Sequence, residues 1–174
     1  MLSSRPVATV AGGRAAQSVT IAPDGTSAYL TDPLDGTVWQ YRISPATGRL
    51  SPLSPATVPT GSGTHDLVIA PDGKNAYVVT VLNHIVSQYR INAATGALSR
   101  RPASTARTVL APELIALAPD GKNAYVTGDI GNLSQYAISP ATGKITPLAP
   151  ATITTPPGGS IGLAVAQPRT SRRK

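Results

Sequence analysis

The chain has 174 residues, the length of one ordinary domain, and 41% of them are hydrophobic, which is enough to form a core. Only 13% are charged, whereas 16 residues are Gly and 17 are Pro, so a coiled coil or a helical bundle is excluded. The absence of cysteine rules out disulfides, thiolate metal sites and a cysteine nucleophile.

The net charge of +7 owes much to the end of the chain, where four of the six residues 169–174 are basic. No aromatic residue interleaves with these charges, so we expect a solvated, disordered tail and no nucleic-acid partner. No apolar run approaches the ~20 residues that cross a membrane, so we expect no membrane partner. The N-terminus lacks the apolar stretch of a secretory signal, and the default expectation is a cytoplasmic protein.

A long repeat organises the chain. Pro-Asp-Gly begins at positions 23, 71 and 119, which are 48 residues apart. Each copy is followed by Ala-Tyr, then Gln-Tyr, then Ala-Thr-Gly. A repeat of this length indicates a solenoid or a propeller.

Each unit predicts four strands, taken here in chain order. The first is short and apolar, over residues 19–21, 67–69 and 115–117. Pro-Asp-Gly then makes a tight turn, because proline fixes φ and glycine accepts positive φ. The second strand follows the turn, over residues 28–31, 76–80 and 124–127.

The third and fourth strands complete the unit. The third alternates Tyr and Ile on one face with Gln on the other, over residues 37–43, 85–91 and 133–138. We expect its tyrosines to be buried between units: Tyr41, Tyr89 and Tyr136. The fourth strand contains prolines that suit an outer edge, over residues 50–53, 98–100 and 145–148.

These patterns predict an all-β fold, a β-propeller with about three complete four-stranded blades and a partial blade at each end. That content is a half-propeller or part of a seven-bladed ring. We expect one domain over residues 1–168, followed by the basic tail 169–174. The expected repeats and partial units are 18–65, 66–113 and 114–161, with 6–17 and 162–168.

Three blades fall short of the 4–8 that close a ring, and the end blades would expose apolar faces. The chain is therefore a piece of a longer protein, a protein that self-associates to complete the ring, or a degenerate remnant.

Two segments carry a resemblance to a known family. Residues 69–80, which read Ile-Ala-Pro-Asp-Gly-Lys-Asn-Ala-Tyr-Val-Val-Thr, resemble the Tyr-Val-Thr-Asn repeat of bacterial seven-bladed propellers. The extended unit, with Gln-Tyr-Arg-Ile-Asn at 88–92 and Thr-Gly-Ala-Leu at 95–98, is closer to the lactonase branch. That branch includes propeller-type 6-phosphogluconolactonases and fungal muconate cyclases. The resemblance covers residues 8–168 and implies a propeller fold, lactone hydrolysis and a family often secreted or periplasmic.

Candidate catalytic residues stand at equivalent places in the three units. Six residues before the proline of each Pro-Asp-Gly stand Gln17, His65 and Glu113. We expect the three side chains to point toward one mouth of the central channel, where His65 would act as general base beside Glu113. Gln17 would hold a carbonyl group.

Other polar residues are predicted in the loops of the same mouth, where the arginines could meet an anionic substrate. The candidate ligand-binding residues are Arg14, Gln17, Asp32, His84, Arg107 and Asp129. The three Pro-Asp-Gly aspartates are expected to be turn formers. Eight dispersed acidic residues do not predict a metal site, and no cofactor motif is present.

Two functions remain open. Because the family's enzymes have about seven blades, the rim set in this chain is incomplete. We therefore expect a non-catalytic propeller module that binds a protein or small ligand through its channel-face loops. The alternative is a lactone hydrolase of the propeller type.

Overall fold

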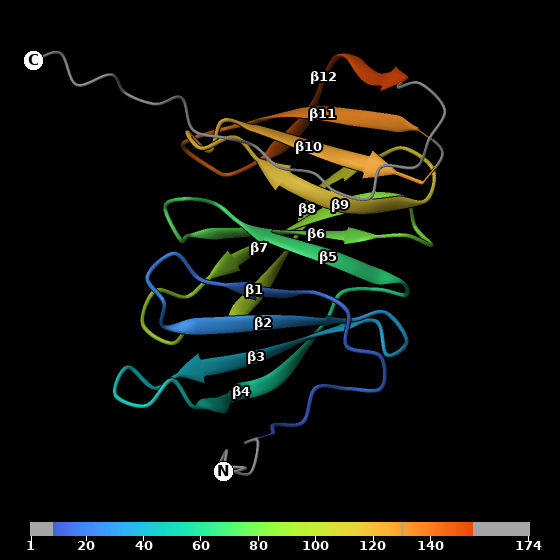
Figure 1. Cartoon of the computed structure of the whole chain (residues 1–174). Helices are drawn as coiled ribbons and strands as arrows, with labels where there is room; N and C mark the ends of the chain where they lie inside the picture. The colour runs from blue at the N-terminus through green and yellow to red at the C-terminus, as the bar shows by residue number, and fades with distance from the viewer. Residues whose placement is uncertain (1–8, 130, 155–174) are drawn as a thin grey trace, which may run out of the picture.

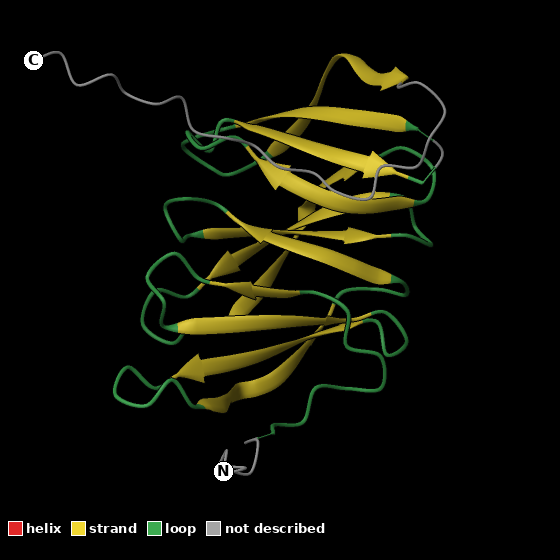
Figure 2. Cartoon of the chain, in the orientation of Figure 1, coloured by secondary structure: helices red, strands yellow, loops and turns green. Residues whose placement is uncertain are grey.

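The computed structural model describes residues 9–129 and 131–154. Within these ranges the chain forms strands and loops and no helix (Figure 2), so no described segment is a helix long and apolar enough to cross a membrane. The described strands form three antiparallel sheets of four strands each. The predicted all-β propeller architecture is thereby confirmed.

Each sheet follows the chain as a simple meander. The first contains β1 (Val19–Ile21), β2 (Ser27–Asp32), β3 (Thr37–Ile43) and β4 (Leu50–Pro59). The second contains β5 (Thr64–Ile69), β6 (Asn75–Thr80), β7 (Ile85–Ile91) and β8 (Leu98–Arg107). The third contains β9 (Pro112–Leu117), β10 (Asn123–Gly128), β11 (Asn132–Ile138) and β12 (Ile145–Thr154).

The three sheets stack as successive blades, with β1, β5 and β9 along one side of the stack (Figure 1). The first strands contact one another across the blades, β5 with both β1 and β9. Prolines occur in β4, β8 and β12, which are edge strands as predicted, where a missing N–H costs little.

The fourth strands are longer than the sequence indicated, with ten residues each instead of three or four. In the first blade the register passes from the Tyr41–Pro52 pair directly to the Trp39–Thr57 pair. The strand thus bulges and then resumes pairing, and the Gln40 amide donates to the Pro55 carbonyl inside the bulge at 2.9 Å. The alternation of apolar and polar residues is lost at such a bulge, so the sequence pattern predicted a fourth strand that was too short.

The third strands of the first two blades are buried on both faces, whereas Gln135 in the third blade is only partly buried. Tyr41, Tyr89 and Tyr136 are each at most 1% exposed, which confirms their predicted burial. Gln40 and Gln88 on the opposite face are equally buried. In the second blade both faces of the third strand are covered because the first blade packs on one face and the third blade on the other.

Tyrosine hydroxyls join each third strand to the preceding blade. Tyr89 donates to the carbonyl of Pro59 at 3.2 Å, and Tyr136 donates to that of Arg107 at 2.7 Å. Tyr41 makes the equivalent bond to Ala11, in the segment before β1. Burial raises the pKa of all three phenols, so they remain neutral donors.

A second contact, here called the blade joint, links each blade to the next. It seats the Ala-Thr-Gly turn of one blade against the second and third strands of the blade before it. Tyr29 donates to the Gly96 carbonyl and Tyr77 to the Gly143 carbonyl, both at 2.7 Å. Gly143 has φ +69, and a Cβ there would lie 2.5 Å from the Gln88 amide nitrogen, so only glycine fits.

Candidate functional site

Three polar residues lie where the inner strands of the three blades begin. His65 is the second residue of β5 and Glu113 the second of β9, while Gln17 precedes β1. The Gln17 N–H donates to the Thr31 carbonyl at 3.0 Å, which extends the β1–β2 ladder by two residues. The structure therefore places the three residues at the same end of adjacent strands.

His65 and Glu113 each occupy a β-bulge. In the second blade Thr64 pairs with Thr80 and Asp66 with Val79, so His65 is the extra residue. In the third blade the register likewise skips Glu113, between the pairs of Pro112 and Leu114. A bulge turns its extra side chain away from the regular alternation and is frequent beside active sites.

The Gln17 and His65 side chains are in contact across two blades. The amide nitrogen of Gln17 lies 2.8 Å from Nε2 of His65 and 3.3 Å from Nδ1. Which of the two groups donates depends on the tautomer of the imidazole ring. Glu113 is partly exposed, and its carboxylate has no hydrogen-bond or ion-pair partner among the described residues.

Asp66 joins all three blades beside this group, and the sequence analysis did not select it. Its Oδ1 accepts the hydroxyl of Ser18 at 2.8 Å, and its Oδ2 accepts the backbone N–H of Ile115 at 3.0 Å. The sequence could have pointed to Asp66 through its position next to His65 and one repeat period after Ser18. Asp66 therefore fixes the spacing of the inner strands around the candidate site.

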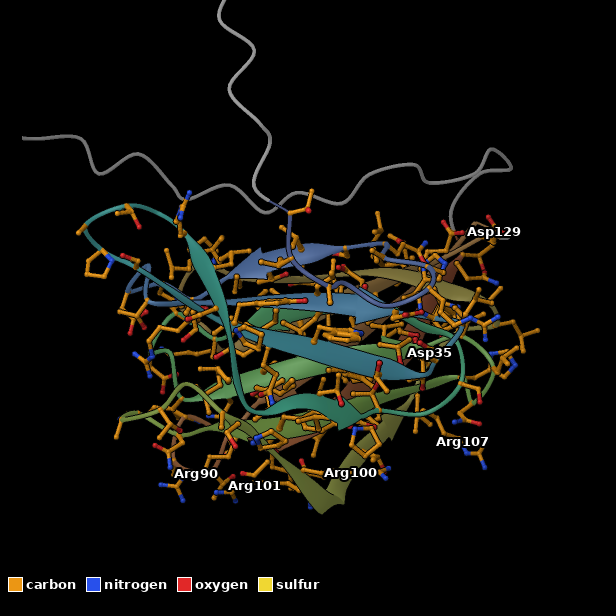
Figure 3. The ribbon with its side chains drawn as sticks, turned by 90° about the horizontal axis from the view of Figure 1, so that it is seen from below. Asp35, Arg90, Arg100, Arg101, Arg107 and Asp129 are labelled. Carbon is orange, nitrogen blue, oxygen red and sulfur yellow. The ribbon has the colours of Figure 1, made fainter. Side chains whose placement is uncertain are left out.

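The loops of the same rim contribute charged groups. Arg14 and Asp35 form an exposed ion pair at 3.8 Å. Figure 3 shows Asp35, Asp129 and Arg107 at one end of the strands, with Arg90 toward the other end. Arg107 and Asp129 are exposed, as a residue that meets a ligand would be.

Asp32 is buried, and backbone groups surround its carboxylate. Oδ2 accepts the N–H of Arg14 at 2.7 Å, and Oδ1 accepts those of Leu34 and Asp35 at 3.0 and 3.2 Å. Burial alone would raise the pKa of Asp32, but backbone hydrogen bonds, which include one from Ala15, together hold this pKa below its usual value. Asp32 thus orders the two loops that carry Arg14 and Asp35.

His84 lies in the loop between β6 and β7. Its backbone has φ 50, an unusual conformation for a residue other than glycine. Its N–H donates to the Val81 carbonyl at 3.3 Å, and its carbonyl accepts the N–H of Thr108 at 3.0 Å. The side-chain Nδ1 is buried without a partner in the described part of the chain. Among the described residues, no hydrogen bond joins His84 to His65.

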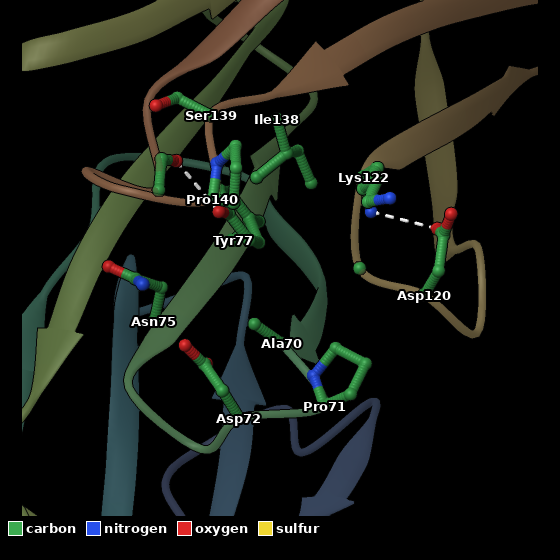
Figure 4. Close-up of a pocket in the computed structure, with 12 residues that line it drawn as sticks. Ala70, Pro71, Asp72, Asn75, Tyr77, Asp120, Lys122, Ile138, Ser139 and Pro140 are labelled. Carbon is green, nitrogen blue, oxygen red and sulfur yellow. Dashed lines mark hydrogen bonds between the residues drawn. The ribbon is translucent and has the colours of Figure 1, made fainter.

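Cavities are found at the opposite rim. One of about 390 Å³ lies between the second and third blades, where Asp72, Tyr77 and Lys122 are among its lining residues (Figure 4). Another of about 400 Å³ lies at the equivalent place between the first and second blades. Because both recur at the blade joint, they follow from blade geometry. Within residues 9–129 and 131–154, no three His, Asp or Glu residues cluster to hold a metal ion.

Comparisons with known proteins agree with this architecture. No curated protein matches the chain. Among solved structures, it is similar to a candidate 6-phosphogluconolactonase of Bacteroides fragilis, with TM-score 0.72 and 24% identity over 80% of this chain and 39% of that one. It is also similar to the periplasmic gluconolactonase of Pseudomonas aeruginosa, with TM-score 0.64 and 28% identity over 75% of this chain and 39% of that one.

A more distant likeness, to the WD40 repeats of RRP9, has TM-score 0.54 and 14% identity and concerns the fold alone. The chain spans about two fifths of the length of the two lactonase structures. Residues 9–155 match the family described as lactonase, 7-bladed beta-propeller. The chain therefore belongs to this family of propellers.

Proposed function

We propose that the rim formed by Gln17, His65 and Glu113 binds the lactone of a sugar acid and hydrolyses it. The observation that carries this proposal is the pair of bulges that present His65 and Glu113 at the starts of adjacent inner strands. Family membership supports it, as does the likeness to a protein named a periplasmic gluconolactonase.

The reaction needs a base, an electrophilic carbonyl and a leaving oxygen. In this proposal the His65 imidazole removes a proton from water as the water oxygen bonds to the lactone carbonyl carbon. The ring C–O bond then breaks, and the leaving ring oxygen takes the proton from the imidazolium. The product is the open-chain hydroxy acid.

The neighbouring residues have defined parts in this scheme. The Gln17 amide contacts the His65 ring and so orients it, a role that differs from holding the substrate carbonyl. The Glu113 carboxylate, on the next inner strand, stabilises the imidazolium while it exists. Arg14 and Arg107 on the same rim attract the carboxylate of the hydroxy-acid product.

The test assays the 174-residue protein against a panel of five- and six-membered sugar-acid lactones, with proton release as the readout. We expect turnover in the wild type, and a loss of about 10²-fold or more in kcat/KM for His65→Gln and Glu113→Gln. Asp72→Asn, at the opposite rim, is the control and should retain full activity.

Calorimetric titration with the same lactones and their hydroxy acids separates binding from catalysis. Binding without turnover would contradict the hydrolase and support a non-catalytic binding module. Turnover that persists in both variants would exclude His65 and Glu113 as the catalytic pair. If the protein showed no binding and no turnover with any of these compounds, the proposal as a whole would be overturned.

A further inference from the structure

The two blade joints among the described residues share one tyrosine bond and use an equivalent glutamine. In each, a tyrosine of the second strand and a glutamine of the third strand form a socket for the following turn. Gln88 donates to the Thr142 carbonyl at 3.0 Å, and Gln40 accepts the N–H of Leu98 at 2.6 Å. The tyrosine bonds and the Gln88 bond satisfy carbonyls of the seated turns, whereas the Gln40 oxygen satisfies the N–H of Leu98, two residues after Gly96.

The third blade carries a socket of the same composition, and no turn among the described residues is seated in it. Asn75, Tyr77 and Gln88 of the second blade recur in the third, in the same strands, as Asn123, Tyr125 and Gln135. Tyr77 is fully buried, whereas Tyr125 is only partly buried and its hydroxyl has no hydrogen-bond partner among the described residues. Among the described residues the Tyr125 hydroxyl is therefore an unused donor, while the Gln135 amide donates to the Pro150 carbonyl of its own blade at 2.6 Å, as Gln40 does to Pro55.

The first blade carries the matching turn, and no socket among the described residues holds it. Residues 44–48 read Ser-Pro-Ala-Thr-Gly, as do residues 139–143, the turn that fills the socket of the second blade. Gly48 has φ +67, close to the +69 of Gly143, so the two turns share this conformation. A Cβ on Gly48 would meet nothing within 4 Å, whereas one on Gly143 would collide with its socket.

We propose that a second copy of this chain docks head to tail, with its 44–48 turn seated in the Asn123, Tyr125 and Gln135 socket. Socket and turn then match, residue for residue, the joint already present between the second and third blades. Two copies related by a twofold axis would make two such joints and bring together six blades, within the number that closes a propeller.

Docking requires one local exchange. In the second and third blades, the strand-centre tyrosine donates to the carbonyl at the end of the preceding fourth strand, which belongs to Pro59 or Arg107. In the first blade the carbonyl of Ala11 takes this place and accepts the Tyr41 hydroxyl. Thr154 holds that position at the end of the third blade, because it pairs with Asn132 as Pro59 pairs with Thr37. In the assembly, Thr154 of the second copy takes the Tyr41 bond and the unpaired segment around Ala11 moves aside.

The experiment is sedimentation equilibrium of the full chain across a range of concentrations. We expect a reversible monomer–dimer equilibrium. Tyr125→Glu, which places a charge in the socket, and Thr47→Glu, which places one on the turn, should each raise the dissociation constant at least about tenfold. Ser62→Glu, an exposed position on the opposite rim, makes the same charge change and should leave the constant unaltered.

Mixing the two weakened variants tests the head-to-tail geometry. The pair retains one intact socket and one intact turn, so the mixture should associate more tightly than either variant alone. An interface in which socket met socket or turn met turn would not give this rescue. Circular dichroism of each variant establishes that it is folded. A wild type that is monomeric at all concentrations, or a dimer unaffected by both substitutions, would overturn the proposal.

Discussion

The hydroxyl of Tyr77 donates to the carbonyl of Gly143, 2.7 Å away and in the next blade. This bond is buried, and burial together with the nearby charge of Asp72 strongly raises the pKa of the Tyr77 phenol. Tyr125 stands at the equivalent place one blade later without such a bond. A comparison of Tyr77 with Tyr125 therefore separates the stability that the blade joint contributes from the stability that a tyrosine in the second strand contributes by itself.

We predict that Tyr77→Phe lowers the free energy of unfolding by about 1–2 kcal/mol, because it leaves the buried Gly143 carbonyl without its donor. Tyr125→Phe, measured at the same low protein concentration, should change stability by less than about 0.5 kcal/mol. Urea unfolding followed by circular dichroism gives both values. Equal losses in the two variants would show that the joint bond contributes nothing.

Glycine substitutions probe the same joint from the turn. Gly143→Ala and Gly48→Ala both place a side chain at positive φ, at a cost of about 1–2 kcal/mol. Only Gly143→Ala should lose a further ~1–3 kcal/mol of stability, because its Cβ would collide with Gln88. Thermal denaturation at low protein concentration measures the difference. If Gly48→Ala were the more damaging, the turn of the first blade would already be seated.

The strand-centre tyrosine of the middle blade should matter more than any single joint bond. Tyr89 is fully buried and belongs to the core cluster that also contains Val78. Tyr89→Ala removes this packing and the bond to Pro59, and we expect a loss of about 3–5 kcal/mol. Chemical denaturation is the measurement. A loss under ~1 kcal/mol would mean that this side chain does not pack between blades.

The Asp32 carboxylate predicts a pH dependence of stability. Its folded-state pKa is below the usual 3.8, so the stabilisation is fully present above that value and is lost as the pH falls through the lower, folded-state pKa. Asp32→Asn keeps one acceptor and loses the other, which should cost about 1–3 kcal/mol at neutral pH. Unfolding at pH 7 and in steps below pH ~4 should show the two proteins converging as the acid carboxyl is protonated. A constant difference over this range would refute the assignment.

The fold was largely readable from the sequence because each blade repeats the same turn residues. Pro-Asp-Gly and Ala-Thr-Gly mark chain reversals, and the strands between them were predicted within a few residues. The length of the fourth strand was not predictable, because its pairing resumes beyond a bulge that Gln40 bridges through tertiary contact.

The candidate site was only partly readable. The 48-residue spacing placed Gln17 and His65 at equivalent positions, and the structure brings their side chains into contact. It did not reveal the bulges, which depend on strand register, nor the role of Asp66, which depends on how blades pack. Asp32 resembled a ligand-binding residue by type and place, yet its backbone partners are visible only in three dimensions. The ligand-binding predictions for these rim residues stay predictions.

Asp66 offers a test of how the three inner strands are held around His65. Asp66→Ala removes acceptors for Ser18 in the first blade and Ile115 in the third and leaves the Ile115 N–H unpaired. We expect a loss of about 2–3 kcal/mol in the free energy of unfolding. Asp72→Ala, which removes only a local bond to the Lys74 N–H in an exposed turn, should cost under ~1 kcal/mol.

A double-mutant cycle makes the Asp66 prediction specific to the contact between blades. Ser18→Ala should cost about 1 kcal/mol in the wild-type background and close to nothing once Asp66 is alanine, because the hydroxyl then has no acceptor to lose. Additive losses would show that Ser18 and Asp66 act separately. In that case the spacing of the inner strands, and with it the contact between Gln17 and His65, would depend on the packing of the blades and not on this carboxylate.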